Sequence, residues 1–234
     1  MWRWSKIGSI NHLREARMTP SSHRIQTPLC LSLGLLISVF FIAGPVWAKP
    51  KDQDRWNKKY EVDVFLFGKE PVPFLKKNAG LLPKGKTLDI AMGEGRNGVF
   101  LATQGFDVTG WDISTVGLQK AHRLAQEHNV SIETQVVDLE KAELPKNTYD
   151  VILMMYYMQR DLFPQIRDAL KPGGMAVIET YNVDYLKYRD FRREWTLDTN
   201  ELLDVFKDFK IIRYQAYDDG EEAYSSIIAQ KPAE

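Results

Sequence analysis

The amino-acid sequence predicts an α/β fold, a doubly wound and mostly parallel sheet of seven strands with an antiparallel C-terminal hairpin. Apolar, strand-like stretches alternate with amphipathic, helix-like stretches over residues 86–181. A glycine turn follows the first of these strands, at 93–98. Two further strand-like stretches, close together in the chain, end the sequence. Alternation of this kind is typical of a parallel sheet with helices on both faces.

The first half of the predicted domain contains two strand–helix units and a third strand. Ser114 is a suitable N-cap for the second helix, because its hydroxyl oxygen can accept from a free backbone N–H. The expected elements are a strand at 86–91, a helix at 95–104, a strand at 106–112, a helix at 114–128 and a strand at 131–138.

The second half begins with a stretch that is almost continuously apolar, as a strand buried on both faces should be. A Lys-Pro-Gly-Gly turn at 171–174 precedes the fifth strand, and a loop at 182–194 follows that strand. Thr196 or Asp198 is expected to open the last helix. The expected elements are a strand at 149–157, helices at 160–170 and 196–206, and strands at 175–181, 209–217 and 223–231.

The bulk composition indicates one globular domain with an N-terminal appendage. The 234 residues are 44% hydrophobic and 26% charged, with a net charge of zero. Residues 1–48 carry +4, so the remainder carries −4, which argues against nucleic acid as a partner. The single cysteine, Cys30, lies in the appendage, and the four histidines offer no metal-binding pair. We therefore expect no disulfide, no cysteine nucleophile and no metal in the domain.

Residues 1–48 predict a signal peptide or a membrane anchor. No charged residue occurs between Arg24 and Lys49, and Val46-Trp47-Ala48 suits cleavage after Ala48. Left uncleaved, the segment is just long enough to span a bilayer, which needs about 20 apolar residues. Basic residues flank it on both sides, so its orientation is open. The domain is expected to be membrane-associated or exported to the periplasm, or else to face the cytoplasm on an anchor.

The residues best suited to bind a ligand lie at the carboxyl ends of the first two strands. Asp89 lies near the end of the first strand, Gly93 and Gly95 make the turn that follows, and Asp112 ends the second strand. This edge of a doubly wound sheet binds ligands, and glycine allows the backbone to approach them closely. The layout predicts a nucleoside cofactor lying across the strand–helix–strand unit.

The same turn satisfies the Gly-x-Gly-x-x-Gly fingerprint of dinucleotide enzymes, so a nicotinamide or flavin cofactor is an alternative. Three features favour S-adenosylmethionine (SAM). Asp89 provides a carboxylate for a cationic ammonium group where dinucleotide sites are usually apolar. Asp138, after the third strand, can accept from an adenine amino group. The Lys-Pro-Gly-Gly turn and the terminal hairpin complete the pattern.

The segment 86–181 resembles the class I SAM-dependent methyltransferases, whose sheet is Rossmann-like. Within them it is similar to the small tellurite-resistance and thiopurine-methyltransferase-like branch, over nearly all of 52–232. The match is carried by Asp-x-Ala-x-Gly-x-Gly-Arg-Asn at 89–97, Trp-Asp-x-Ser at 111–114 and Tyr-Asp at 149–150. By this resemblance, residues 49–85 are a lead-in that covers the cofactor, and 86–234 are the methyltransferase domain.

The resemblance implies a role for each matching position. Asp89 would face the ammonium group of the methionine moiety, and Asp112 would bind both ribose hydroxyls. The other implied contacts are Ala91, Gly93 and Gly95 along the methionine and ribose, Ile113, Asp138 and Leu139 around the adenine, Met154 and Met155 under the sulfonium, and Trp56 and Tyr60 over the site. Each position also has a purely structural alternative, such as a helix cap for Asp112 or core packing for the methionines.

No catalytic residue is identified by the sequence. Methyl transfer from a sulfonium depends on positioning, and a base is needed only when the nucleophile arrives protonated. The candidates near the acceptor are Tyr156, Tyr157, Arg160, Tyr181, Tyr185, Arg192 and Arg193. The chain lacks the Asn/Asp-Pro-Pro-Tyr pattern of amino-methylating enzymes at 154–157, which disfavours N-methylation of bases or side-chain amides.

The leading hypothesis is a SAM-dependent methyltransferase that transfers a methyl group to a small-molecule acceptor by direct displacement. The acceptor would be a thiol, a metalloid oxyanion or another soft nucleophile. Two alternatives stay open, a nicotinamide-dependent oxidoreductase and a non-catalytic, SAM-binding, membrane-tethered protein.

Overall fold

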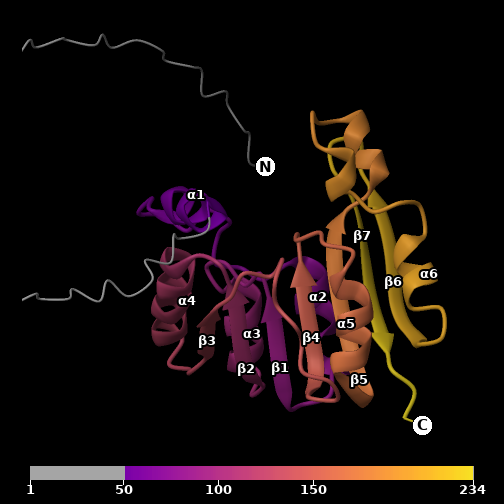
Figure 1. The fold of residues 1–234 in the computed structure, drawn as a ribbon, viewed down its shortest axis with the longest axis horizontal. Coiled ribbons are helices and arrows are strands. Elements are labelled where there is room, and N and C mark those ends of the chain that lie inside the picture. The colour runs from indigo at the N-terminus through magenta and orange to yellow at the C-terminus, as the bar shows by residue number, and fades with distance from the viewer. Residues whose placement is uncertain (1–50, 234) are drawn as a thin grey trace, which may run out of the picture. The chain divides into compact units, whose positions relative to one another are not determined.

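The computed structural model describes residues 51–233, and the predicted seven-stranded α/β sheet is confirmed (Figure 1). The strand order is β3-β2-β1-β4-β5-β7-β6. The strands are β1 Lys86–Ile90, β2 Asp107–Asp112, β3 Glu133–Val136, β4 Tyr149–Met155, β5 Leu170–Tyr181, β6 Lys210–Asp218 and β7 Ala223–Gln230. The expected signal peptide or anchor at 1–48 lies outside the described residues.

The helices alternate with the strands as predicted. They are α1 Lys51–Tyr60, α2 Pro73–Asn78, α3 Arg96–Thr103, α4 Thr115–Glu127, α5 Leu162–Ala169 and α6 Glu201–Val205, with short 3-10 turns at η1 Ala79–Leu81, η2 Val183–Lys187 and η3 Arg193–Trp195. Ser114 is the N-cap of α4, and its Oγ accepts from the Gly117 N–H. No helix within residues 51–233 is long and apolar enough to cross a membrane.

Strands β3, β2, β1, β4 and β5 are parallel, and β7 runs antiparallel between β5 and β6. The strand order reverses between β1 and β4, where Ile90 is level with Met154. Ligands bind at this switch point in doubly wound sheets, at the carboxyl ends of the strands. Figure 1 shows that α1 and the segment 183–195 both lie at this edge of the sheet.

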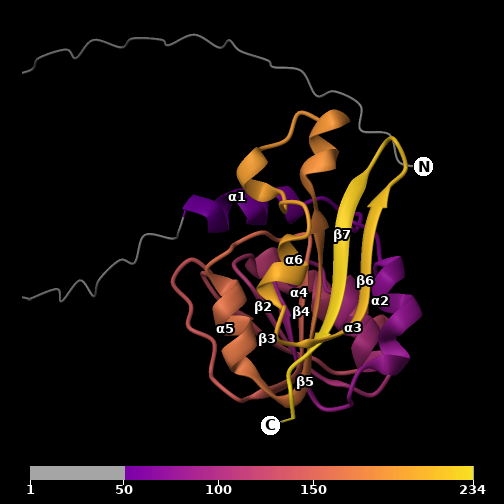
Figure 2. The ribbon, with the colours of Figure 1, turned by 90° about the vertical axis from the view of Figure 1, so that its right-hand side faces the viewer.

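Two apolar cores fill the two faces of the sheet. Helices α2, α3 and α4 pack on one face and α5 and α6 on the other (Figure 2). Because side chains alternate along a strand, Val151, Leu153 and Met155 of β4 lie in the first core, whereas Ile152 and Met154 lie in the second. This burial on both faces explains the continuous apolar run of β4.

Two element boundaries differ from the sequence prediction for physical reasons. The fourth strand ends at Met155 instead of 157, because Tyr156 turns into the left-handed region at φ +54°. The last helix begins at Glu201 rather than 196, since Asn200 has φ +63°. Leu197, which was expected inside that helix, instead donates its N–H to Tyr181 O at the end of β5.

The other boundaries shift less, and all for local reasons. The third strand is shorter than 131–138, and Asp138 lies beyond it in a turn. The fifth strand is longer than 175–181, because it takes in the Lys-Pro-Gly-Gly turn and begins at Leu170. The helix expected at 160–170 is therefore confined to 162–169.

Candidate active site

The glycine turn joins the ends of β1 and β2. Gly93 and Gly95 have φ +58° and +88°, a conformation that costs glycine little. The Gly93 N–H donates to Asp112 Oδ2 at 2.7 Å, and the Met92 N–H donates to Trp111 O at 3.0 Å. The turn is thus held directly against the carboxylate that ends the second strand.

Asp112 is buried and already accepts two backbone hydrogen bonds. Its Oδ1 accepts from the Ser114 N–H at 2.8 Å, in addition to the bond from Gly93. A carboxylate has about four acceptor sites, so further hydroxyl groups can bind the same oxygens. Burial raises the pKa of Asp112, and the hydrogen bonds from these backbone groups lower it in part.

Asp89 lies in β1, and its carboxyl group is close to Gly98 of α3. Its side chain is 2% exposed, and Oδ2 has no hydrogen-bond partner among the described residues. Burial raises its pKa to about 7, although the nearby Gly98 N–H lowers the pKa in part. A buried carboxyl oxygen without a partner is costly, so a cation or donor delivered to this point would be stabilised.

Ala91 occupies the turn with a strained backbone. Its φ is +55°, a left-handed conformation that an L-residue with a Cβ adopts at a cost of roughly 1–2 kcal/mol. Strain of this kind clusters at functional sites and survives only where the surrounding structure enforces it.

The expected cover residues lie over the turn. Tyr60 is buried, and its Oη lies 2.7 Å from the position that a Cβ on Gly93 would take. Trp56 stacks on Tyr60 with ring centroids 5.6 Å apart. Burial and the nearby charges of Asp112 and Glu94 raise the pKa of the Tyr60 hydroxyl. The two aromatic residues of α1 therefore close the edge above Gly93.

Helix α1 is also tied to the second strand–helix connection by polar bonds that the sequence did not reveal. Gln53 Nε2 donates to Ile113 O at 3.0 Å. Asn57 Oδ1 accepts from Ser114 Oγ at 2.8 Å and from the Val116 N–H at 3.3 Å. Both residues lie in the lead-in at 49–85, and its resemblance to a cofactor-covering segment was the only signal available for them.

A buried ion pair fixes the segment after α1. Lys120 Nζ lies 2.7 Å from Glu94 Oε1 and also donates to Val64 O at 2.7 Å. Glu94 Oε2 accepts from the Phe67 N–H at 3.2 Å. The sequence offered one sign of this pair, a charged residue between the two glycines of the turn.

Asp138 and Leu139, which were predicted to surround the adenine, have their own hydrogen-bond partners and do not bond the glycine turn. Asp138 Oδ1 accepts from the Glu140 N–H, and its Oδ2 pairs with Lys141 at 2.6 Å. Leu139 is buried, and its carbonyl accepts from Gln159 Nε2. Tyr157 donates to Gln159 Oε1 at 2.7 Å, and burial with nearby acidic groups raises its pKa to about 12. Tyr157 thus lies on this side rather than with Tyr156.

The methionines predicted under the sulfonium are core residues as well as strand-end residues. Met154 and Met155 are both buried, one in each of the two apolar cores. Ile113 is half-buried in the connection between β2 and α4.

The acceptor candidates divide into two groups. Tyr156, Tyr181 and Tyr185 form an aromatic cluster with Phe191 and Tyr224. The ring centroids of Tyr156 and Tyr181 are 5.1 Å apart, and those of Tyr181 and Tyr185 are 3.9 Å apart. Phe191 contacts Tyr181 and Tyr185 edge-on, and Tyr224 contacts Tyr156.

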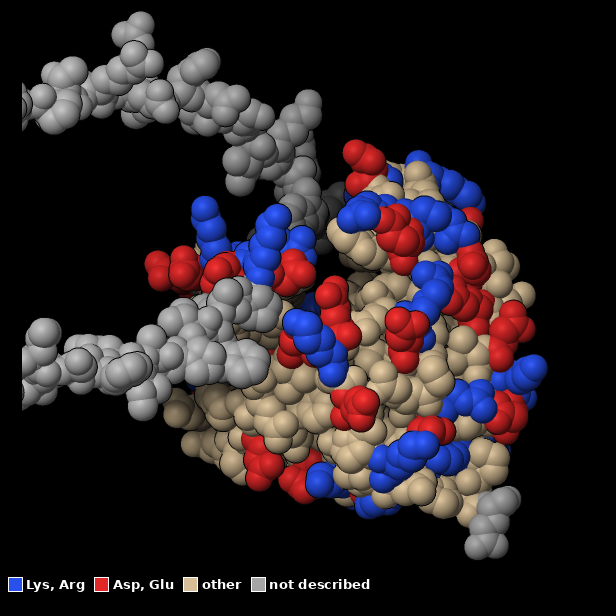
Figure 3. All heavy atoms as spheres, in the orientation of Figure 1, with Lys and Arg blue, Asp and Glu red and all other residues tan. Residues whose placement is uncertain are grey.

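The three arginine candidates form ion pairs with acidic side chains. Arg160 binds Glu201 Oε1 and Oε2 at 2.7 and 2.8 Å and also donates to Thr196 O. Arg192 and Arg193 are exposed and pair with Glu194 and Asp198. Figure 3 shows acidic and basic side chains interspersed over the upper edge of the molecule. These arginines therefore hold the segment 192–201 together.

A carboxylate at the end of β5 completes this side of the site. Glu179 is 1% exposed and accepts from Ser226 Oγ at 2.7 Å. Its backbone oxygen accepts from the Tyr156 N–H at 2.6 Å, and burial raises the pKa of its carboxyl group. The signal that the sequence offered was a carboxylate at the end of an apolar strand, the same pattern that identified Asp89.

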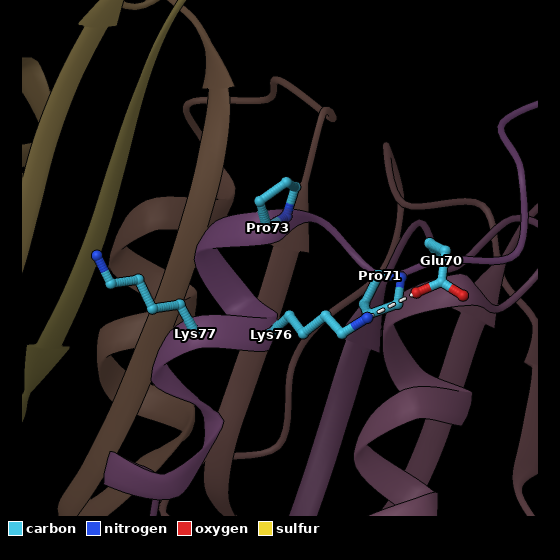
Figure 4. A pocket seen from close by; sticks show the side chains of 5 residues that line it. All are labelled: Glu70, Pro71, Pro73, Lys76 and Lys77. Atoms are coloured by element: carbon cyan, nitrogen blue, oxygen red, sulfur yellow. Dashed lines mark hydrogen bonds and ion pairs between the residues drawn. The ribbon is translucent and has the colours of Figure 1, made fainter.

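Two surface hollows of the described chain lie away from these groups. Figure 4 shows one of them on the outside of α2, where Lys76 Nζ pairs with Glu70 Oε2 at 2.8 Å. None of its lining residues belongs to the predicted cofactor set. Within residues 51–233, no three His, Cys, Asp or Glu side chains are arranged to hold a metal.

Comparison with known proteins agrees with this geometry. The model of the family "Tellurite resistance protein TehB" matches residues 49–223. This chain belongs to the TehB family. The expected resemblance to the tellurite-resistance branch of the class I SAM-dependent methyltransferases is thereby confirmed.

One sequence relative and two solved structures describe the relationship. The first is "Probable S-adenosyl-L-methionine-dependent methyltransferase TehB" of Haemophilus influenzae, 25% identical over 70% of this chain and 57% of its own length. The crystal structure of TehB from Haemophilus influenzae has a TM-score of 0.58 at 21% identity, covering 76% of this chain and 66% of that one. Magnesium protoporphyrin IX methyltransferase from Synechocystis, solved with bound SAH, has a TM-score of 0.55 at 18% identity, covering 78% and 95%.

Proposed function

We propose that this chain is a SAM-dependent methyltransferase that transfers a methyl group to a small-molecule acceptor by direct displacement. The observation that carries the proposal is the glycine turn bonded to Asp112, with the unpartnered carboxyl oxygen of Asp89 beneath it. The chain spans 57% of the Haemophilus influenzae relative, so activity is proposed on the site rather than on the relative's name.

The described residues fit SAM by the chemistry of their donors and acceptors. Asp89 would hold the ammonium group, since its Oδ2 lacks a partner, and Asp112 would accept from the ribose hydroxyls. Trp56 and Tyr60 would exclude water above Gly93. When bound, SAM supplies an electrophilic methyl group. The protein supplies position and electrostatics.

An aromatic cluster near the turn supports the proposed acceptor site. The aromatic cluster of Tyr156, Tyr181 and Tyr185 lies at the ends of β4 and β5, adjacent to the turn. Arg96, which follows Gly95 directly, has its guanidinium 5.8 Å from the centroid of the Tyr156 ring. The cluster is thus next to the place where the methyl group would be presented.

Calorimetric titration of the purified domain with SAM, S-adenosylhomocysteine and NAD tests this proposal. SAM and S-adenosylhomocysteine should bind and raise the unfolding midpoint, and NAD should do neither. Binding of NAD alone would favour the nicotinamide-dependent alternative. Binding of SAM without turnover over a broad acceptor panel would favour the non-catalytic alternative.

We also propose that the N-terminal segment directs the domain to a membrane, as an anchor or an export signal. The support is the uncharged stretch between Arg24 and Lys49 and the Val46-Trp47-Ala48 ending. Expression of the full chain with a C-terminal reporter, followed by fractionation and protease treatment of spheroplasts, tests it. Recovery of all full-length chain in the soluble cytosolic fraction would contradict it.

A further inference from the structure

The segment that leads from α1 toward α2, residues 64–72 and here named the crossing segment, is bonded to the glycine turn. Its Phe67 is held on both sides of the backbone. The Phe67 N–H donates to Glu94 Oε2 at 3.2 Å, and Phe67 O accepts from Arg96 NH1 at 2.9 Å. Two polar residues of the turn that was predicted to bind a cofactor therefore bind this segment.

Two further side chains fix the crossing segment near its ends. Asn97 Oδ1 accepts from the Val72 N–H at 3.0 Å, and Lys120 Nζ donates to Val64 O at 2.7 Å. Asn97 and Lys120 are both buried, and Lys120 also pairs with Glu94. Buried polar groups are costly without partners, so these bonds hold the segment in one position on the turn.

Tyr60 lies in a slot between two glycines. Its Oη lies 2.7 Å from the position that a Cβ on Gly93 would take, and its Cε2 lies 3.1 Å from the position of a Cβ on Gly117. A side chain at Gly93 would displace the phenol, and one at Gly117 would press on its ring. The buried Tyr60 ring thus closes the space above the turn for as long as it stays in this slot.

Phe67 connects the crossing segment to the slot. Its ring contacts the Tyr60 ring edge-on, with the centroids 6.3 Å apart, and Lys59 Nζ lies 5.5 Å from the centroid of the Phe67 ring. Phe67 is 39% exposed, so its ring does not fill a core. Because its backbone is fixed on both sides, this ring restricts the movement of Tyr60.

We propose that Glu94, Asn97 and Phe67 are positioning residues for the cofactor and that they act through Tyr60. By holding the crossing segment on the turn, they keep Tyr60 in its slot and slow the exchange of SAM and S-adenosylhomocysteine. The inference rests on the proposed methyltransferase function and deepens it, because it names the groups that set how long the cofactor stays bound. These residues act on binding kinetics and not on the transfer of the methyl group.

Exchange of the cofactor then requires the crossing segment to open. Opening breaks the bonds that Phe67 and Val72 make to the turn, but Glu94 and Lys120 keep each other as partners. The buried charges therefore stay paired, and the segment opens at a smaller cost than unfolding of the whole domain. Opening also exposes the two backbone N–H groups to solvent, so hydrogen exchange measures it.

The first test measures dissociation of S-adenosylhomocysteine from the purified full-length chain by surface plasmon resonance, with thermal unfolding of each variant. Phe67→Ala removes the ring and keeps both backbone bonds. Dissociation should become about 3- to 10-fold faster, the effect of one aromatic contact, with an unchanged unfolding midpoint. Phe67→Tyr restores the ring and should restore the wild-type rate. Val64→Ala, which shortens a side chain that is 69% exposed in the same segment, is the matched control.

The second test uses hydrogen exchange, which separates a role in cofactor binding from a role in stability alone. In the wild-type chain, the backbone N–H groups of residues 64–72 should exchange more slowly when S-adenosylhomocysteine is bound. Asn97→Ala removes the acceptor of the Val72 N–H, so the protection by S-adenosylhomocysteine should be smaller and dissociation should be faster. If this variant does not fold, Phe67→Ala still decides the question.

The outcomes separate this inference from the proposed function. A wild-type chain that binds neither SAM nor S-adenosylhomocysteine would overturn both. Normal binding with one and the same dissociation rate in the wild type and in folded Phe67→Ala would overturn this inference alone. So would an exchange rate of the crossing segment that S-adenosylhomocysteine does not change.

Discussion

Lys120 Nζ lies 2.7 Å from Glu94 Oε1, and both side chains are 3% exposed. The pair joins helix α4 to the middle of the glycine turn. Because Lys120 also binds Val64 O and Glu94 also binds the Phe67 N–H, the segment after α1 is held by the same two side chains. The position of the lead-in and the position of the turn are thus fixed together.

Replacing Lys120 by methionine should lower the free energy of unfolding by about 3–5 kcal/mol, because it leaves Glu94 as a buried charge without a partner. The double variant Lys120→Met with Glu94→Gln should recover part of this loss, since no charge then remains buried. Urea unfolding followed by circular dichroism measures both. Lys76→Met, which removes the exposed pair with Glu70, is the control and should leave stability unchanged.

Asp112→Ala should weaken SAM binding by about 1–3 kcal/mol, the cost of lost hydrogen bonds to the ribose. In terms of Kd this is roughly a 5- to 150-fold increase. Calorimetry measures the affinity, and circular dichroism verifies the fold, because Asp112 also holds the Gly93 and Ser114 N–H groups. Asp107→Ala, at the exposed opposite end of β2, should bind SAM normally. Wild-type affinity in a folded Asp112→Ala protein would count against its assigned role.

Ala91→Gly should raise stability by up to about 1 kcal/mol. The left-handed strain that it removes at φ +55°, about 1–2 kcal/mol, exceeds the extra chain entropy that glycine loses on folding, about 0.5–1 kcal/mol. The same exchange at Ala102, a buried residue in the last turn of α3, should lower stability by about 1 kcal/mol. Thermal unfolding of the two variants side by side tests the pair. Equal losses would show that Ala91 is not strained.

Asp89 should make stability depend on pH in a defined direction. Its pKa in the folded protein is about 7, whereas an unfolded aspartic acid titrates near 4. Between these values the folded state binds a proton that the unfolded state does not, so stability falls as pH rises. The difference in unfolding free energy, wild type minus Asp89→Asn, should therefore decrease from about pH 4 to about pH 7. A constant difference would contradict the buried, neutral carboxyl.

The same group links SAM binding to proton release. An ammonium group brought to Asp89 favours its ionised form, so binding below about pH 7 should release a proton. Calorimetric titrations in two buffers with different ionisation enthalpies measure the number released. Asp89→Asn should release none from this site, and equal release in both proteins would place the ammonium group elsewhere.

Most of the candidate cofactor site could be predicted from the sequence, because the patterns that indicate it extend over only a few residues. An apolar run ending in a carboxylate, followed by glycines at short spacing, specifies both a strand end and a close backbone approach. Asp89, Gly93 and Asp112 are therefore found together as expected. Ser114 is the predicted cap for the same reason, since a cap depends on its own turn.

The acceptor side was only partly predictable. Tyr156 and Tyr157 are neighbours in the sequence, and both were expected beside the acceptor. A left-handed turn at Tyr156 sends Tyr156 toward Glu179 and leaves Tyr157 beside Gln159 and the expected adenine side. No local periodicity specifies this divergence, because it depends on the bond from Tyr156 to the neighbouring strand β5.

The sequence by itself determined the class of sheet, the antiparallel hairpin and the glycine turn between two strand-end carboxylates. These features follow from side-chain periodicity and from the conformational freedom of glycine, and both act over a few residues. Only the tertiary structure decided that Glu179 meets Tyr156, that Lys120 neutralises Glu94, and that Arg160 braces Glu201. Those contacts join residues far apart in the chain, so they depend on strand order and register.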